Sequence, residues 1–292
     1  MWPVGASPVP VDWWQPSVKR NAWRSLAVSK QLAQSARKRF GQNFLIDPQI
    51  IDAIVSSVAA TPEDHLVEIG PGHGAITEGL FASGARLTLI ELDRDLIPGL
   101  LAAFVSQAPK RCELLSSDVL KVDLRALDGP LRIVGNLPYN ISTPLLFKLL
   151  EVAEQIIDIH VMLQQEVVNR ITAPPGTSAY GRLSVMIQAQ ADAERLIDVP
   201  PMSFAPPPKV DSGVIRIRPN SAKRAQIDDL NTLEALVRQA FGQRRKTLRN
   251  NLKDWVSDHT FESLGINAQD RPERLPVETY VTLANALATM ES

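Results

Sequence analysis

Short apolar runs alternate with helical patterns between His65 and Gly135, and this alternation is the feature that most constrains the fold. The apolar runs lie at 66–69, 87–90, 113–115 and 131–135. Strands separated by helices predict a parallel sheet with helices on both faces. Each run ends in polar or glycine-rich residues, namely the turn 70–74, Glu91, Asp118 and Asn136. Because ligands bind beyond the carboxyl ends of parallel strands, these positions predict one binding site at one edge of the sheet.

The remaining pattern divides the chain into three parts. Helices are predicted around 144–152, 166–171 and 182–191, and strands around 157–163 and 214–217. Beyond Pro219 the pattern is helical without strands, over 233–241, 245–252 and 277–288. We therefore predict an α/β domain over residues 34–219 and a small all-helical domain over 220–292. Residues 1–33 show neither period and predict a poorly ordered extension, although their tryptophan and arginine residues also fit stacking on nucleic acid.

Composition excludes several classes of protein. No uninterrupted apolar run approaches the roughly 18–20 residues that a membrane span needs. Cys112 is the only cysteine, which excludes an internal disulfide and a cysteine-based zinc site. The four histidines are scattered without metal-ligand spacing, so we predict no metal site. Together these points favour a cytoplasmic protein with no membrane association.

The net charge of −1 conceals two concentrated basic segments. Residues 1–46 and 238–253 each carry a net charge of +6, which leaves −13 for the rest of the chain. Two basic segments on an acidic body predict a localised surface for a polyanion. The alternative is two solvated faces without a partner.

A glycine-rich turn followed by a carboxylate about 20 residues later is typical of a nucleotide ribose site. Gly72 and Gly74 let the backbone approach a ligand, and Glu91, 21 residues after Gly70, can accept hydrogen bonds from both ribose hydroxyls. This pattern alone fits a dinucleotide dehydrogenase nearly as well as an S-adenosylmethionine enzyme. The chain shows no catalytic set for hydride transfer, and Asp118 follows its strand where it can accept from an adenine amine.

The segment Asn136–Tyr139 adds a second place for a planar group. Asn136 supplies both a hydrogen-bond donor and an acceptor. Pro138 fixes its own φ and favours an extended Leu137, which directs the Leu137 carbonyl out of the strand. Tyr139 offers a flat face for stacking. These groups can hold a base that carries an exocyclic amine, which together with a cofactor site predicts methyl transfer to a nucleobase. For these four residues alone, a strand that ends in a turn at proline is an equally good interpretation.

At these residues the chain resembles a known family. The sequence Asn-Leu/Pro-Pro-Tyr after the fourth strand is similar to the motif of amino-group methyltransferases that act on adenine. More specific matches, in the same order as in the family, are 38–45 (KRFGQNFL), 68–72 (EIGPG), 136–142 (NLPYNIS), 165–170 (QEVVNR), 180–185 (YGRLSV), 204–212 (FAPPPKVDS) and 243–247 (QRRKT). They resemble the KsgA/RsmA family, the dimethyladenosine transferases of small-subunit ribosomal RNA. The resemblance covers about residues 37–290, and the first 33 residues have no counterpart.

The resemblance implies a Rossmann-like methyltransferase domain, a helical RNA-binding domain and a role in small-subunit biogenesis. It implies that S-adenosyl-L-methionine is bound by Asn43, Leu45, Gly70, Glu91, Asp118 and Asn136. The spacing of the glycines adds Gly72 to this set. It implies that the substrate is 16S rRNA within the immature 30S subunit, where two adjacent adenosines in the 3′-terminal hairpin loop each receive two methyl groups. We expect the enzyme to act as a monomer.

The target base is expected to lie against Asn136, Leu137, Pro138 and Tyr139. The resemblance implies that Phe204 covers its second face, whereas a core position for Phe204 is the alternative. The candidates for phosphate contacts are Arg37, Lys38, Arg39, Arg244, Arg245, Lys246 and Arg249.

Two other functions remain open at this point. A dimethyltransferase of the antibiotic-resistance type, acting on large-subunit (23S) rRNA, has the same fold, although Pro206–Pro208 and the sequence after them favour the small-subunit family. The second open function is that of a non-catalytic ribosome-assembly factor. Such a factor would not need the glycines together with Glu91, Asp118 and Asn136.

Overall fold

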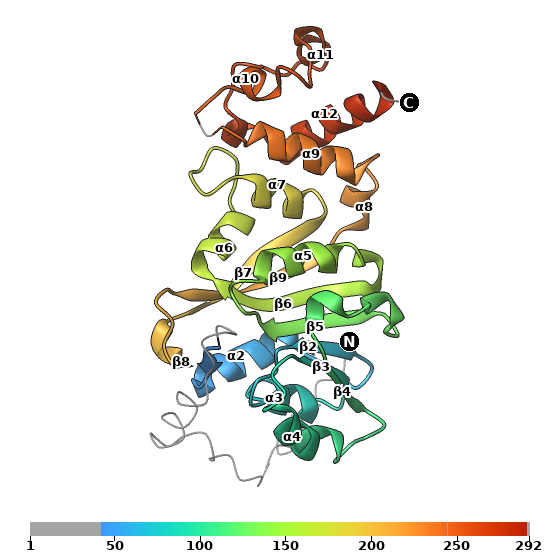
Figure 1. Ribbon diagram of the computed structural model, residues 1–292, viewed down its shortest axis with the longest axis vertical. Helices are drawn as coiled ribbons and strands as arrows, with labels where there is room; N and C mark the ends of the chain where they lie inside the picture. The colour runs from blue at the N-terminus through green and yellow to red at the C-terminus, as the bar shows by residue number, and fades with distance from the viewer. Residues whose placement is uncertain (1–41, 244, 291–292) are drawn as a thin grey trace, which may run out of the picture.

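A seven-stranded sheet forms the centre of residues 42–243 and 245–290, which the computed structural model describes (Figure 1). Its order is β4-β3-β2-β5-β6-β9-β7. The strands are β2 (His65–Ile69), β3 (Arg86–Glu91), β4 (Cys112–Ser116), β5 (Leu131–Asn136), β6 (Ile156–Gln164), β7 (Ala191–Val199) and β9 (Ser212–Pro219). Strands β2 to β6 pair in parallel, as predicted, whereas β9 runs antiparallel to both β6 and β7.

Helices cover both faces of this sheet, which confirms the predicted α/β architecture. One face packs against α5 (Ser142–Leu150), α6 (Gln165–Ile171) and α7 (Arg182–Gln188). The other face packs against α2 (Pro48–Val58), α3 (Thr77–Ala82) and α4 (Ile97–Leu100), which continues as one π-helical turn over Leu101–Val105. Helix α2 begins at Pro48, because the Asp47 side chain accepts a hydrogen bond from the Gln49 N–H and Pro48 occupies the first helical position.

Strand β7 was not predicted from the sequence. The helix expected over 182–191 ends at Gln188, and the chain returns along the edge of the sheet. An edge strand does not need an apolar run, and this one instead forms ion pairs: Glu194 with Arg216 and Arg218 of β9, and Asp192 with Lys223. A second unpredicted ladder joins β1 (Phe44–Leu45) to β8 (Phe204–Ala205), with Leu45 opposite Phe204.

The C-terminal helices form one end of the molecule, at the top of Figure 1. They are α8 (Ser221–Arg224), α9 (Leu230–Ala240), α10 (Leu248–Leu252), α11 (Asp258–Ser263) and α12 (Val277–Met290). Helix α10 begins three residues later than predicted and α11 was not predicted. Their hydrophobic core includes Leu236 and Tyr280 and extends to Val185 and Met186 of α7. This core therefore contains residues from both sides of the predicted domain boundary at residue 219. The boundary stays a prediction.

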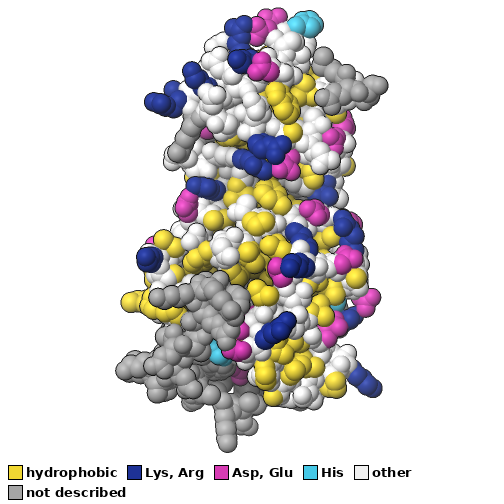
Figure 2. Space-filling view, viewed as in Figure 1, with side chains coloured by type: hydrophobic (Ala, Val, Ile, Leu, Met, Phe, Trp, Pro, Cys, Tyr) yellow, Lys and Arg dark blue, Asp and Glu magenta, His cyan; other side chains and the backbone are white. Residues whose placement is uncertain are grey.

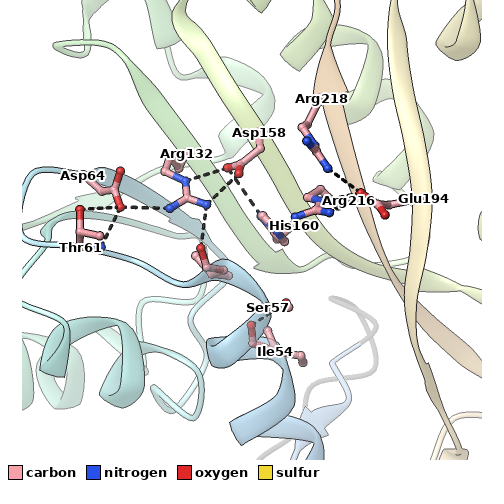
Figure 3. A network of polar contacts seen from close by, with 11 residues as sticks. Ile54, Ser57, Thr61, Asp64, Arg132, Asp158, His160, Glu194, Arg216 and Arg218 are labelled. Atoms are coloured by element: carbon pink, nitrogen blue, oxygen red, sulfur yellow. Dashed lines mark hydrogen bonds and ion pairs between the residues drawn. The ribbon is translucent and has the colours of Figure 1, made fainter. Parts of the chain in front are cut away.

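Arg132, near the start of β5, anchors three elements at the end of the sheet away from the predicted site (Figure 3). It donates to Asp158 of β6 at 2.9 and 2.7 Å, to Asp64 at 3.0 Å and to the Val58 carbonyl of α2 at 2.7 Å. Burial alone would raise the pKa of Asp158, but the nearby His160 ring and the hydrogen bonds from Arg132 lower it to about 2. This network holds the end of α2 against β5 and β6. None of the helices in the described ranges is long and apolar enough to span a membrane.

Candidate active site

A pocket of about 320 Å³ opens where β2, β3 and β5 end. It brings together most of the predicted site residues, from segments far apart in the sequence. The predicted residues that line it are Asn43, Gly70, Gly72, Glu91, Asp118, Asn136, Leu137, Pro138 and Tyr139. Leu45 lines a smaller adjoining cavity of about 40 Å³. The residues at the strand ends thus line one pocket at one edge of the sheet, as predicted.

Asn136 is oriented by a contact with Asn43, which also lines the pocket. Its Nδ2 donates to the main-chain carbonyl of Asn43 at 3.1 Å. Since the amide nitrogen is held there, the side-chain oxygen is the atom left to accept from a ligand. The β1–β8 ladder begins at the next residue, Phe44, and this pairing keeps the Asn43 carbonyl in place.

The residues after Asn136 are held by different parts of the sheet. The Leu137 N–H donates to the Met162 carbonyl of β6 at 3.2 Å, and the Leu137 side chain is buried. The Tyr139 hydroxyl and the Ser212 hydroxyl share a hydrogen bond of 2.8 Å. Burial raises the pKa of Tyr139, and the contact with Ser212 opposes this rise. The half-buried Tyr139 ring is therefore fixed at the pocket, and its hydroxyl is protonated at neutral pH.

The glycine turn and Glu91 hold each other in place. Gly70 and Gly72 have φ of +68° and +61°, a region that side chains other than glycine rarely adopt. The Gly72 N–H donates to one Glu91 oxygen at 3.1 Å, and the Leu92 and Asp93 N–H groups donate to the other at 2.9 and 2.8 Å. Burial raises the pKa of Glu91, and these backbone hydrogen bonds lower it. A positioned carboxylate beside an open glycine backbone suits a ribose diol.

Asp118 follows β4 and caps a short 3₁₀ turn over Val119–Lys121, because its Oδ1 accepts from the Leu120 N–H at 3.0 Å. This bond fixes the half-buried carboxylate at the wall of the pocket. The described part of the chain contains no group of three or more His, Cys, Asp and Glu side chains that could hold a metal ion.

Comparisons with known proteins agree with this geometry. The sequence profile of the family described as ribosomal RNA adenine dimethylase matches residues 33–289. The chain belongs to this family. Ribosomal RNA small subunit methyltransferase A of Laribacter hongkongensis is 53% identical over 251 residues, covering 85% of this chain and 95% of that protein. The protein of the same name from Pseudomonas fluorescens is 50% identical over 264 residues, covering 89% and 97%.

Solved structures of dimethyladenosine and rRNA methyltransferases share the fold of this chain. A dimethyladenosine transferase from Plasmodium falciparum superposes with a TM-score of 0.74 at 23% identity, covering 84% of this chain and 97% of that chain. The 23S rRNA methyltransferase ErmE gives a TM-score of 0.67 at 25% identity, covering 84% and 100%. Membership confirms the predicted Rossmann-like fold and the enzyme class, a methyltransferase that uses S-adenosylmethionine.

Phe204 is not where a base-stacking residue of the adenine dimethylase family is expected. Its ring is 2% exposed and packs in the core, because β8 pairs with β1 and turns the side chain inward. In this conformation the ring exposes no face to a base, as in the alternative core position, and the base-stacking role stays a prediction.

The predicted phosphate-binding residues are only partly described. Arg37, Lys38, Arg39 and Arg244 lie outside the described residues. Arg245, Lys246 and Arg249 are exposed, and Arg249 forms an ion pair with Asp258. Figure 2 shows Lys and Arg side chains, with Asp and Glu among them, over the end formed by the C-terminal helices.

Two residues that the sequence reasoning missed also shape the site. Asp93 is 4% exposed, lines the pocket and accepts from Gln42 Nε2 at 2.9 Å. Its position two residues after Glu91, at the same strand end, was an available signal. Ser212 is fully buried and was noted only as part of a motif, since its contact with Tyr139 depends on the fold.

Proposed function

We propose that this chain transfers methyl groups from S-adenosylmethionine to the exocyclic amines of two adjacent adenosines in the 3′-terminal hairpin loop of 16S rRNA, two to each. The substrate is the rRNA of an immature 30S subunit, and the enzyme acts in the cytoplasm as a monomer. The orientation of Asn136 carries the proposal. With Nδ2 held by the Asn43 carbonyl, Oδ1 is available to accept from an amine.

The cofactor site follows from groups already described. S-adenosylmethionine supplies, when bound, a methyl group on a positively charged sulfur. Glu91 accepts from the ribose hydroxyls, Asp118 from the adenine amine, and the open backbone at Gly70 and Gly72 admits the methionine part. Asn43, Leu45 and Asn136 complete this set. The positive φ angles of the two glycines support the fit, because a side chain at either would be strained.

The chain prepares the amine for attack without removing a proton beforehand. The lone pair of an adenine amine is delocalised into the ring, so the amine is a weak nucleophile. Asn136 Oδ1 and the Leu137 carbonyl accept its two hydrogens, which favours a tetrahedral nitrogen with its lone pair directed at the methyl group. Fixed dipoles of this kind commonly supply the largest share of catalysis, and alignment of the two reactants adds to it. After transfer the proton leaves to solvent.

Tyr139 supports one face of the extruded base. Stacking on an aromatic ring contributes roughly 1–3 kcal/mol per base, and a loop adenosine costs less to extrude than a paired one. The hydrogen bond to Ser212 holds the ring, so its orientation is set before the base arrives. The exposure of Arg245 and Lys246 supports a role in phosphate contacts, which would make RNA binding dependent on salt.

The names of the relatives favour the small subunit over the alternatives. The proteins from Laribacter hongkongensis and Pseudomonas fluorescens, at 53% and 50% identity, are named small subunit methyltransferases, whereas ErmE, named a 23S rRNA methyltransferase, is 25% identical. The intact pocket argues against a non-catalytic assembly factor.

Methylation of purified subunits tests the proposal. Protein, labelled S-adenosylmethionine and unmethylated 30S or 50S subunits are incubated, and the RNA is digested to nucleosides. We expect label in dimethyladenosine from 30S subunits only. Label from 50S subunits would establish the large-subunit alternative, and no label from either despite cofactor binding would establish a non-catalytic factor.

A further inference from the structure

The hydrogen bond that holds Tyr139 is only as firm as the placement of Ser212. Ser212 is fully buried and is the first residue of β9. It pairs with Gln164 of β6 and Val199 of β7, and the chain before it is the loop 206–211. Because the ladder of β9 begins at this residue, contacts from outside the ladder add most to its placement. A residue that supplies such contacts can act on Tyr139 without touching it.

Gln165, the first residue of α6, contacts this strand end through its main chain and its side chain. Its N–H donates to the Asp211 carbonyl at 2.9 Å. In one orientation of the side-chain amide, the nitrogen donates to the Ser212 carbonyl at 2.9 Å and the oxygen accepts from both terminal nitrogens of Arg195 at 3.1 Å. The opposite orientation gains a contact with Asn169 at 3.2 Å but sets two oxygens against each other at Ser212. We therefore assign the first orientation, in which one residue binds two consecutive carbonyls.

Gly213 provides independent evidence that the Gln165 side chain lies against β9. A glycine inside a strand weakens it and often marks a close approach by another group. The φ of Gly213 is not in the left-handed region, so its backbone does not require a glycine. An added Cβ would lie 2.8 Å from the end of the Gln165 side chain, whereas its next contacts, with Val168 and Ile197, are ordinary ones at 3.4 and 3.5 Å. The space that a side chain would need at this position is taken by the Gln165 amide.

The position of Gln165 in the sheet brings it to the target-base segment. It follows β6, which lies next to β5 and parallel to it, so it comes at the edge of the sheet that carries the pocket. The segment 137–139 is held by β6 and its extension at both ends. The Leu137 N–H donates to the Met162 carbonyl at 3.2 Å, and the Tyr139 hydroxyl bonds to Ser212, which Gln165 contacts.

We propose that Gln165 is a positioning residue for the target adenine, acting through Ser212 on the Tyr139 ring. The proposal rests on the proposed function in taking an rRNA adenine as the base that stacks on this ring. Gln165 fixes the start of β9, the Ser212 hydroxyl then fixes the phenol, and the orientation of the ring is set before the base arrives. Gln165 is not among the described residues that line the cofactor pocket, so its loss should affect RNA and not the cofactor.

The two partners of the Gln165 amide can be separated by substitution. Arg195 lies on β7 and also pairs with Asp198 at 3.4 Å, so it stays near Gln165 when the amide changes. Gln165→Glu keeps an acceptor for Arg195 but replaces the donor to Ser212 by an oxygen. Gln165→Met keeps the length of the side chain and removes both contacts. If Ser212 is the partner that matters, the two variants should have the same defect.

Methylation of 30S subunits, with the subunit concentration varied at saturating S-adenosylmethionine, tests the proposal. We expect Gln165→Met and Gln165→Glu to raise KM for the subunit about fivefold, the factor that corresponds to one net hydrogen bond. The affinity for S-adenosylhomocysteine should not change. Gly213→Ala, whose new methyl group displaces the Gln165 amide, should raise KM by a similar factor. Gln188→Met is the matched control, because the Gln188 amide donates to the carbonyls of Ile171 and Ala173 and not to Ser212. It should lower stability in urea and leave KM unchanged.

Combination with Ser212→Ala shows whether Gln165 acts through Ser212. Since the link to Tyr139 is already lost in Ser212→Ala, adding Gln165→Met should raise KM little further. A full additional rise would indicate that Gln165 contacts RNA by itself and would overturn the proposal.

The single variants can contradict the proposal in three other ways. An unchanged KM in Gln165→Met would show that Gln165 does not position the ring. A normal KM in Gln165→Glu beside a raised one in Gln165→Met would assign the effect to Arg195. An equal rise in Gln188→Met would show a general loss of stability. If the unsubstituted protein failed to methylate 30S subunits, the proposed function itself would be contradicted.

Discussion

Asn136 donates its side-chain amide to the main-chain carbonyl of Asn43 at 3.1 Å, across 93 residues of chain. This one bond decides which end of the amide faces the pocket. The nitrogen is held and the oxygen is free to accept, which is the orientation that an amine substrate needs. The contact also links the fourth strand of the parallel sheet to the segment that precedes β1.

Replacing Asn136 by Ala removes one of the two proposed acceptors. We expect kcat to fall about 10²–10³-fold, the usual effect of losing one preorganised hydrogen-bonding group, with a smaller loss of cofactor affinity. Rapid-quench methylation of 30S subunits at saturating cofactor measures this change. Asn231→Ala, at an exposed position in α9, is the matched control and should retain activity. Near-normal dimethylation by Asn136→Ala with normal cofactor binding would refute the mechanism.

Tyr139 and Ser212 should act as a pair. Ser212→Ala or Tyr139→Phe each removes the shared hydrogen bond, which is expected to cost about 1 kcal/mol of stability and to raise KM for RNA several-fold by loosening the ring. In the double variant the second change should add little, since the interaction is already lost. Urea unfolding and KM measurements on all four proteins complete the cycle. Strictly additive effects would show that the two hydroxyls act independently.

The glycine turn should not tolerate a side chain at Gly72. Its φ of +61° costs another residue about 1–2 kcal/mol, and an added Cβ would lie 3.3 Å from the Phe44 ring. We expect Gly72→Ala to weaken S-adenosylhomocysteine binding about tenfold in calorimetry. In Gly99→Ala an added Cβ meets nothing within 4 Å, and this helical position should gain up to about 1 kcal/mol with unchanged affinity. Unchanged affinity in both variants would separate the turn from cofactor binding.

Glu68 should make the stability of the ligand-free enzyme depend on pH. Its pKa is about 8 in the folded protein, against 4.5 for the free group. Between these values the folded state keeps a proton that the unfolded state has lost. The free energy of unfolding therefore falls as the pH rises, by at most about 1.4 kcal/mol per pH unit. Glu68→Gln should flatten this fall between pH 5 and 8 and be the more stable protein at pH 8. Urea unfolding at several pH values measures the free energy of unfolding of both proteins. Parallel pH profiles for the two proteins would contradict the prediction.

Charge reversal should separate RNA binding from cofactor binding. Lys246→Glu, in the exposed segment before α10, should weaken binding to 30S subunits and reduce the slope of log affinity against log salt by about 1. Lys110→Glu makes the same change at an exposed position before β4 and should leave RNA affinity largely unchanged. Filter binding at several salt concentrations, with S-adenosylhomocysteine affinity measured in parallel, makes the comparison. Loss of both affinities in Lys246→Glu would indicate misfolding.

The parts of the site that were predicted share one property. Gly70, Glu91, Asp118 and Asn136 each follow a strand with a clear apolar run, and parallel topology brings such strand ends together. The burial of Phe204 was not predicted, because a motif states which residue is present but not which way its backbone turns. Strand β7 was missed because it lacks an apolar pattern: its charged side chains form ion pairs with β9 and with Lys223.

The sequence by itself determined the alternation of strands and helices, the glycine turn and the family, because apolar period, glycine and proline act locally along the chain. Only the tertiary structure decided how the Asn136 amide is oriented, that Ser212 holds Tyr139, and that the Glu68 Oε2 is buried beside the glycine turn without a hydrogen-bond partner among the described residues. Each of these depends on groups that meet across a sheet edge or a buried cavity, and such contacts follow from packing between distant segments.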